Sequence, residues 1–282
     1  MPSRHRRAKA ARPRSSQGDQ SVTFNHLEVI VNLTRREVAG RYRGSMLGIL
    51  WSLLTPLLML AVYTFMFGTV LRMRWAGGGD AQPTAEFALI LFVGLIFFQT
   101  FSEMLTRAPT LILANVSFVK KVVFPLEILP VVALAAALFH MLVSFLVMLI
   151  FLLLSRGSIP LTAPLLPIVV APFMLLLIGL SWFFAAAGVY FRDISQVLNP
   201  IVSALMFLSP IFVPTEALPS AVRPWLTLNP ISIPVEQARQ VLIFDQIPNW
   251  SALAVYTIAA AIIAGLGFLF FQATRKGFAD VL

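Results

Sequence analysis

Apolar residues gather in six long stretches that are separated by shorter polar or basic segments. The stretches lie at about 47–71, 87–105, 126–154, 163–190, 196–213 and 251–272. A helix needs roughly 20 apolar residues, at 1.5 Å each, to cross a bilayer. The pattern therefore predicts an all-α polytopic membrane protein with six transmembrane helices per subunit in a domain at 47–272. The fifth stretch is short and contains Pro200 and Pro210, which is typical of a moving or re-entrant element.

Residues 21–46, which precede the first stretch, have a basic and moderately amphipathic pattern. At 100° per residue, one face of a helix here would hold Leu27, Ile30, Val31, Thr34 and Val38. We expect this helix to lie in the membrane interface and to run directly into the first transmembrane helix. Glycines would loosen the chain where it turns into the bilayer, at Gly40, Gly44 and Gly48.

The composition excludes a soluble globular protein. Of the 282 residues, 59% are hydrophobic and 12% are charged, whereas about 25% are charged in an average soluble domain. The net charge is +9, and most of the 21 basic residues fall on one side of the membrane if residues 1–46 are cytosolic. Because basic residues mark cytosolic loops, both termini are expected in the cytosol. Residues 1–20 would be a disordered basic tail and residues 273–282 a short second tail.

The sequence lacks the common signatures of enzymatic chemistry. It has no G-x-x-x-x-G-K-[ST] phosphate-binding loop, no H-E-x-x-H and no G-x-S-x-G. The absence of cysteine excludes disulfides and thiolate metal sites. We therefore expect no catalytic, cofactor-binding or metal site in this chain, and any ATP would be hydrolysed by a separate partner subunit.

Three ionisable residues fall inside the apolar stretches, where such groups are costly and often functional. We interpret Glu103 and Glu127 as interfacial ion-pair partners of Lys120 or Lys121. We interpret His140 as a neutral histidine that is hydrogen-bonded to a neighbouring helix. A transport role for the two carboxylates and a proton relay through His140 stay open as alternatives.

Aromatic residues are frequent, with 24 Phe, 4 Tyr and 5 Trp. Aromatic rings can pack against the C–H faces of sugar rings without strong hydrogen bonds that would hold a sliding chain. Candidate residues for such a glycan path are Tyr42, Trp51, Tyr63, Phe67, Phe207 and Phe212. For any single phenylalanine, the simpler interpretation is a lipid-facing side chain.

Two connections between the stretches are more than plain loops. Residues 106–125 have apolar content of their own, and they predict a short helix around 115–122 that lies flat under the membrane. Residues 214–250 contain six prolines but stay apolar enough to return into the interface. There Ser232 could cap a helix and Pro234 could lie in its first turn.

Several of these segments together resemble the membrane subunit of type-2 ABC exporters, in the branch that exports polysaccharides such as O-antigen, capsule or teichoic acid. The resemblance begins with LTRREVAGRYRGSMLGILWSLLTPLL and continues through LILANVSFVKKVVFPLEILP, YFRDISQVLNPI and LTLNPISIPVEQARQ. It covers about residues 22–280 in the expected order and spacing. Each motif alone is a loose pattern, and the resemblance is specific only because all of the motifs occur together.

The resemblance implies a homodimer in the cytoplasmic (inner) membrane of a bacterium, docked on two cytosolic ABC ATPase subunits that bind ATP and Mg. The substrate would be a glycan linked to undecaprenyl or to a phospholipid, and no nucleic acid is expected as a partner. Two other classes stay open. One is a type-2 ABC exporter of small lipophilic compounds. The other is a membrane-embedded transferase or proton-coupled carrier that works without an ATPase.

The resemblance also implies roles for particular residues. The ATPase-coupling residues map to Asn115, Val116, Phe118, Val119, Lys120, Lys121, Arg192 and Asp193. Short helices that close the path on the outer side imply a gate at Pro214, Trp225, Asn229, Pro230 and Arg239. We further hypothesise that the lipid pyrophosphate of the substrate meets Arg35, Arg36, Arg41 or Arg43 near the cytosolic entrance.

Overall fold

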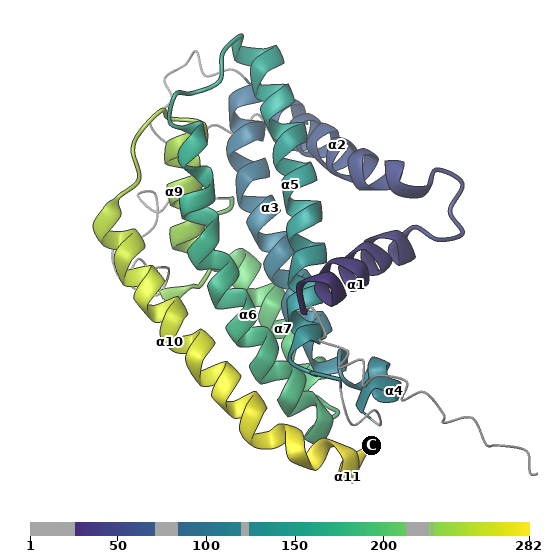
Figure 1. Cartoon of the computed structure of the whole chain (residues 1–282). Helices are drawn as coiled ribbons and strands as arrows, with labels where there is room; N and C mark the ends of the chain where they lie inside the picture. The colour runs from purple at the N-terminus through teal and green to yellow at the C-terminus, as the bar shows by residue number, and fades with distance from the viewer. Residues whose placement is uncertain (1–25, 71–83, 120–123, 213–225, 227) are drawn as a thin grey trace, which may run out of the picture.

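The computed structural model describes residues 26–70, 84–119, 124–212, 226 and 228–282 (Figure 1). Within these ranges every regular element is a helix, and five helices are long and apolar enough to cross a membrane. The chain is therefore an all-α, multi-pass membrane protein, as its apolar pattern predicts. The expected tail at 1–20 lies outside the described residues, as does most of the connection after residue 212.

The helices of spanning length follow the predicted stretches to within a few residues. They are α2 (Trp51–Tyr63, with turns at Gly48–Leu50 and Thr64–Val70), α3 (Thr84–Arg107), α5 (Ile128–Arg156), α6 (Leu166–Tyr190, after the turn Ala163–Leu165) and α10 (Trp250–Thr274). The shorter helices are α1 (His26–Arg41), α4 (Val116–Val119), α7 (Ile194–Phe207), α9 (Ser232–Leu242) and α11 (Phe278–Val281). The apolar runs thus locate the helices well because a bilayer demands one continuous helix for each crossing.

The fifth predicted stretch, 196–213, differs from the structure. It corresponds to α7, which has 14 residues and ends at Phe207. At 1.5 Å per residue its length is about 21 Å, less than the roughly 30 Å of a hydrocarbon core. Pro200 lies inside the helix, and Pro210 follows its end. The six-helix expectation is therefore met by five spanning helices and one shorter apolar helix.

The interfacial helix α1 does not run directly into α2, contrary to expectation. The chain turns between them, with φ of +88° at Gly44 and +53° at Gly48, values that favour glycine. As a result α1 and α2 diverge from the turn like the arms of a V (Figure 1). The predicted apolar face of α1 is only partly covered, because Val38 is buried whereas Leu27 and Val31 are exposed.

Helix α3 forms the centre of the packed core. It lies between α5 and α6 (Figure 1), and its Phe97 ring packs edge-on against two neighbours. The centroids lie 5.8 Å from Phe145 of α5 and 5.1 Å from Phe173 of α6. Much of the aromatic content at this level therefore stabilises the helix packing instead of facing lipid or a transport path.

Small residues allow α6 and α10 to approach until their backbones touch. A methyl group on Gly179 of α6 would overlap the backbone at Ala264, and one on Gly267 would overlap the Gly179 carbonyl oxygen. Such contacts between small residues are a common way for transmembrane helices to associate. By contrast, a methyl group on Gly265 of α10 would meet no atom within 4 Å, because this glycine faces outward.

The first prediction follows from this contact. In Gly267→Ala the added methyl group should push α6 and α10 apart, at a cost of roughly 1–3 kcal/mol. The melting temperature of the detergent-purified protein should therefore fall by several degrees. The control Gly265→Ala, on the same helix, should leave it unchanged. Equal melting temperatures for the two variants would show that the backbones are not in contact.

Candidate functional site

Two reciprocal ion pairs join the interfacial helix α1 to the end of α3. Glu37 and Arg41 are one turn apart on α1, and Glu103 and Arg107 are one turn apart on α3. The Arg41 guanidinium donates to both carboxylate oxygens of Glu103, one of them at 3.2 Å, and Arg107 pairs with Glu37. The two helices therefore cross in antiparallel directions with opposite charges in register. This double contact holds α1 across the lower part of the bundle.

Both carboxylates form ion pairs, as expected, and the partners that the structure describes are arginines. Glu103 pairs with Arg41, and Glu127 pairs with Arg275 at 3.1 Å. The expected partners Lys120 and Lys121 lie outside the described residues. The ion pair raises the pKa of the Arg41 guanidinium, because its hydrogen bonds to Glu103 favour the charged form. Arg41 is therefore engaged within the protein and is not a freely available phosphate ligand.

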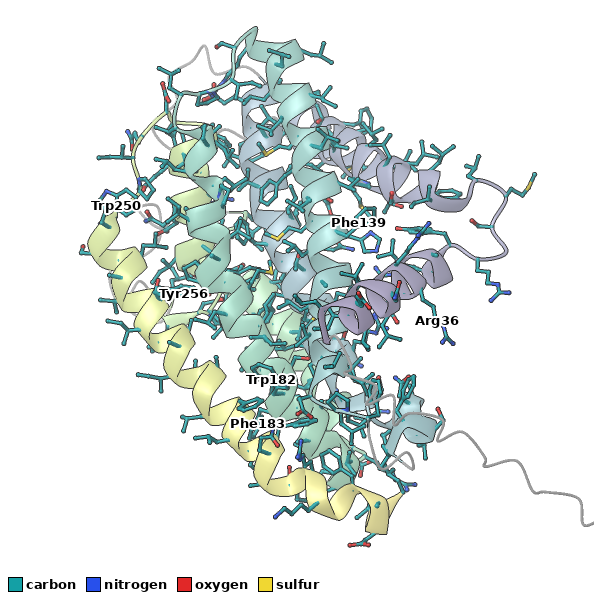
Figure 2. All side chains as sticks on the ribbon, in the orientation of Figure 1. Arg36, Phe139, Trp182, Phe183, Trp250 and Tyr256 are labelled. Atoms are coloured by element: carbon teal, nitrogen blue, oxygen red, sulfur yellow. The ribbon has the colours of Figure 1, made fainter. Side chains whose placement is uncertain are left out.

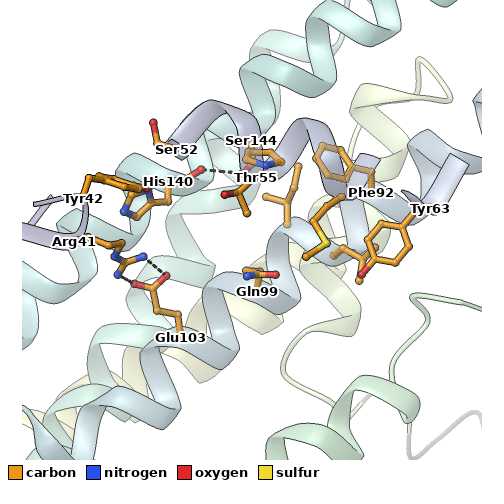
Figure 3. A pocket seen from close by; sticks show the side chains of 14 residues that line it. Arg41, Tyr42, Ser52, Thr55, Tyr63, Phe92, Gln99, Glu103, His140 and Ser144 are labelled. Atoms are coloured by element: carbon orange, nitrogen blue, oxygen red, sulfur yellow. Dashed lines mark hydrogen bonds and ion pairs between the residues drawn. The ribbon is translucent and has the colours of Figure 1, made fainter. Parts of the chain in front are cut away.

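A cleft of about 250 Å³ opens above α1, between α2, α3 and α5 (Figure 3). Its lower part is polar and is lined by the Arg41–Glu103 pair, Tyr42 and His140. Its upper part is apolar and includes Phe92. Each wall is a stripe at helical spacing: Ser52, Thr55, Pro56, Met59 and Tyr63 on α2, and Phe92, Leu95, Ile96, Gln99 and Glu103 on α3.

His140 of α5 lies in the wall of this cleft, beside the end of α1. Its Nδ1 atom is 3.2 Å from the Tyr42 hydroxyl, and the two rings meet edge to face. Burial raises the pKa of Tyr42, so the hydroxyl keeps its proton and can donate to a neutral imidazole. The structure thus supplies the hydrogen-bond partner that the sequence interpretation of His140 requires. The Nε2 atom has no partner among the described residues.

A second cavity, of about 470 Å³, lies on the other side of α1 and reaches residues 108–119, the described part of the predicted coupling segment. Its lining includes Glu37, Arg107, Asn115 and Phe118. The predicted helix at 115–122 is present as a turn at Leu113–Asn115 followed by α4, Val116–Val119. Helix α1 therefore separates a cleft within the bundle from a cavity beside the coupling segment, and the Arg41 side chain lines both.

The other coupling candidates, Arg192 and Asp193, are exposed in the turn between α6 and α7. They lie at the same end of the molecule as the coupling segment. The backbone of Gly188, near the end of α6, packs directly on Pro109 in the turn that follows α3. The structure thus brings the two coupling regions to one end of the bundle through this close contact.

The remaining arginines of the entrance hypothesis are placed differently from Arg41. Arg35, Arg36 and Arg43 are exposed, and none of them forms an ion pair within the part of the chain that is described. Arg36, labelled on α1 in Figure 2, also lines the second cavity. Three of the four predicted arginines are therefore available to an anionic ligand.

The predicted aromatic path is only partly assembled. Tyr42 and Tyr63 line the cleft, whereas Trp51 and Phe207 are exposed outside it. The Phe207 ring stacks on Phe212, with centroids 6.4 Å apart. The side chain of Phe67 is not among those described. Within one subunit the structure does not bring the five described side chains into a single lining.

The outer gate stays a prediction, and its described members are bonded within the subunit. The Asn229 amide donates to the carbonyls of Leu205 at 3.1 Å and Leu208 at 3.0 Å, near the end of α7. Pro230 accepts a hydrogen bond from the Tyr256 hydroxyl at 2.9 Å. Pro214 and Trp225 lie outside the described residues.

Arg239 of α9, also assigned to the gate, is 3% exposed. Its guanidinium donates to three backbone carbonyls, those of Ile90 (3.0 Å), Pro210 and Ile211 (3.0 Å). Burial lowers its pKa to about 9, which leaves it charged at neutral pH. Arg239 therefore joins α3, α9 and the segment after α7.

Sequence reasoning missed Glu37, Arg107, Thr55 and Gln99. The first two could have been found from the spacing, since two helical segments each carry opposite charges four residues apart. Thr55 and Gln99 give no such signal, because a single uncharged polar residue in an apolar stretch does not reveal its neighbours.

The ion pairs generate the second prediction. Glu103→Arg should place two positive charges together and loosen α1, lowering stability by roughly 1 kcal/mol or more. The double variant Arg41→Glu/Glu103→Arg should recover most of the lost melting temperature. As a control, Arg43→Glu/Glu103→Arg introduces the same charge two residues away, where it cannot form the ion pair with position 103. This variant should not recover the melting temperature. Equal recovery in both double variants would contradict the assigned pairing.

Comparison with known proteins extends over most of the chain. The family model described as ABC-2 type transporter matches residues 28–243. The chain is 25% identical over 257 residues to the O-antigen export system permease protein RfbA of Klebsiella pneumoniae, which covers 90% of this chain and 95% of that relative. It is 26% identical over 260 residues to RfbA of Myxococcus xanthus, covering 91% and 96%.

A third relative is the polysialic acid transport protein KpsM of Escherichia coli. It is 27% identical over 234 residues, which are 81% of this chain and 87% of the relative. The matched regions include α1, the cleft-forming helices and the coupling segment. Because the family model matches far more than half of the chain, the protein belongs to the ABC-2 type transporter family.

Proposed function

We propose that this chain is the transmembrane subunit of an ATP-driven exporter of a lipid-linked polysaccharide in the inner membrane of a bacterium. The main support is that its relatives, similar over as much as nine-tenths of the chain, are named for O-antigen export or polysialic acid transport. The fold also supports the proposal, because α1, expected to lie in the membrane interface, shares a cavity with the segment expected to contact the ATPase.

We propose that the energy comes from two cytosolic ABC ATPase subunits. The sequence contains no phosphate-binding loop of the G-x-x-x-x-G-K-[ST] type. The turns at Ala108–Thr110 and Leu113–Asn115 and helix α4 follow α3 without a break. A force on this coupling segment would therefore reach the end of α3, and the two ion pairs would pass it to α1.

A homodimer with both termini in the cytosol belongs to the same proposal. Helix α2 supports it, because most of its apolar surface is uncovered within one subunit, including Leu58 (56% exposed) and Val62 (52%). Such a surface suits either a second subunit or lipid. The excess of basic residues on the side of residues 1–46 supports the orientation.

We propose that Arg35, Arg36 and Arg43 form the substrate entrance, which is supported by their exposure. These exposed guanidinium groups lie on α1 or in the turn after it. A planar guanidinium group can bind two oxygens of one phosphate through two parallel N–H groups. Arg41 instead holds α1 to α3. The lipid pyrophosphate would then meet the outer surface of α1 while Arg41 keeps the helix in place.

No specific observation favours either of the two alternative functions, an exporter of small lipophilic compounds or a transferase or carrier that works without an ATPase. An exporter of small lipophilic compounds would share the fold, and it predicts export that is independent of glycan synthesis. A proton-coupled carrier would need titratable carboxylates, but Glu103 and Glu127 are both engaged in ion pairs.

The third prediction tests the proposed function. The chain should co-purify with an ABC ATPase subunit, and the reconstituted complex should export labelled lipid-linked glycan into vesicles. Changing Arg35, Arg36 and Arg43 together to Gln should reduce that export roughly tenfold or more, since charge-assisted hydrogen bonds are lost, while ATPase assembly stays intact.

The matched control replaces the same three arginines by Lys. If each guanidinium group binds a phosphate through two N–H groups at once, lysine should restore export only partly, because its ammonium group lacks this planar arrangement of donors. Full restoration by Lys would mean that the residues only hold the helix to anionic lipid, and the entrance assignment would be wrong. Absence of glycan export by the unaltered complex would contradict the proposed function itself.

A further inference from the structure

The cleft above α1 differs from an ordinary lipid-facing surface, because it exposes hydrogen-bonding groups that have no protein partner. The Gln99 amide on α3 and the Thr55 hydroxyl on α2 line the cleft and are exposed. Neither side chain makes a hydrogen bond to any described residue. Polar groups without partners are costly at membrane depth. An occupant that can bond to them would therefore be favoured.

The cleft is polar at one end and apolar at the other. Towards α1 its lining holds Tyr42, His140 and the Arg41–Glu103 pair, and farther along α2 and α3 it holds Met59, Tyr63, Phe92 and Leu95 (Figure 3). Gln99 and Thr55 lie on the two opposing helices between these ends. This order matches an amphiphile with a polar head near α1 and an apolar chain beside the upper helices.

Charge and hydrogen-bonding capacity indicate the class of head group. Arg41 and Glu103 neutralise each other, so the cleft has no excess positive charge to attract a phosphate. An amide and a hydroxyl both donate and accept hydrogen bonds. A sugar hydroxyl does the same, whereas a phosphate only accepts and a choline group has no N–H or O–H to donate.

We propose that this cleft is a subsite for an uncharged, hydroxyl-bearing head group, the sugar next to the lipid of a lipid-linked glycan. The identification of this sugar as part of a lipid-linked glycan rests on the proposed function. The preference for a hydroxyl-bearing group follows from the residues that line the cleft. A volume of about 250 Å³, near the lower end for small-molecule sites, suits one ring. The apolar lining that continues beyond Gln99 and Thr55, which includes Met59, would lie beside the start of the lipid chain. The walls come from one subunit, so each subunit has its own subsite.

The chain has no cysteine, which allows a direct binding assay on the full-length protein in phosphatidylcholine nanodiscs. Ser52→Cys introduces one thiol at the cleft, where the native hydroxyl only bonds to the Ile49 carbonyl of its own helix, at 2.7 Å. The rate of maleimide labelling is measured with added decyl glucoside or with decylphosphocholine, which has the same tail. Met59→Cys is a second reporter if the first variant fails to fold.

Decyl glucoside should slow the labelling, and decylphosphocholine should do so much less. Gln99→Leu and Thr55→Val, which remove hydrogen-bonding groups while keeping similar shapes, should each raise the glucoside concentration for half-protection, by roughly tenfold for Gln99→Leu. The control Gln246→Leu changes an exposed glutamine in the link between α9 and α10, outside the cleft lining, and should leave protection unchanged.

Three results would overturn the subsite. One is equal protection by the two detergents, and another is unchanged protection in both cleft variants. The third is equal protection by nanodiscs that contain phosphatidylglycerol, which would assign the hydroxyl groups to a bilayer lipid.

Because the assay needs neither ATPase nor export, it separates the two proposals. Glycan export without glucoside protection contradicts only the subsite. Glucoside protection in a chain whose complex exports no glycan contradicts only the proposed function.

Discussion

The reciprocal ion pairs between α1 and α3 are the constraint on which the rest of the site depends. Helix α1 buries little apolar surface, with Val38 as its buried aliphatic side chain, so hydrophobic burial alone positions it weakly. A single, partly exposed ion pair contributes little, but two pairs in register also define the direction and height of the helix. That position separates the cleft in the bundle from the cavity beside α4.

Under the proposed function, this arrangement would link α1 to movement of the segment proposed to contact the ATPase. Helix α3 is packed at the centre of the core and continues into the turns before α4, so its end and α4 are covalently close. Helix α1 follows that end through the ion pairs and packs against α5. Helix α2 is connected to α1 by a glycine-containing turn and diverges from it. The cleft between α1 and α2 is therefore the part of the site whose shape can change most readily.

The spanning helices could be predicted from sequence because the bilayer imposes a length and an apolar composition that are visible in one segment at a time. The ion-pair partners could not, since Arg41 and Glu103 are 62 residues apart and their meeting depends on how α1 crosses α3. The partners of Arg239 could not be predicted for a related reason. A basic residue in a connection is normally in water, but here three carbonyls around a broken helical segment bind it inside the protein. Gln99 and Thr55 became meaningful only when α2 and α3 placed them in one cleft.

The most direct test of the central claim measures two distances across the ATP cycle in the assembled exporter. Spin labels on cysteines introduced at Asn32 of α1 and Thr110 after α3 report on the linked unit, and labels at Asn32 and Leu58 of α2 report on the cleft. All three positions are exposed. The account predicts that ATP binding leaves the Asn32–Thr110 distance unchanged and shifts the Asn32–Leu58 distance. A change in the first distance as large as in the second would show that α1 and α3 do not move together.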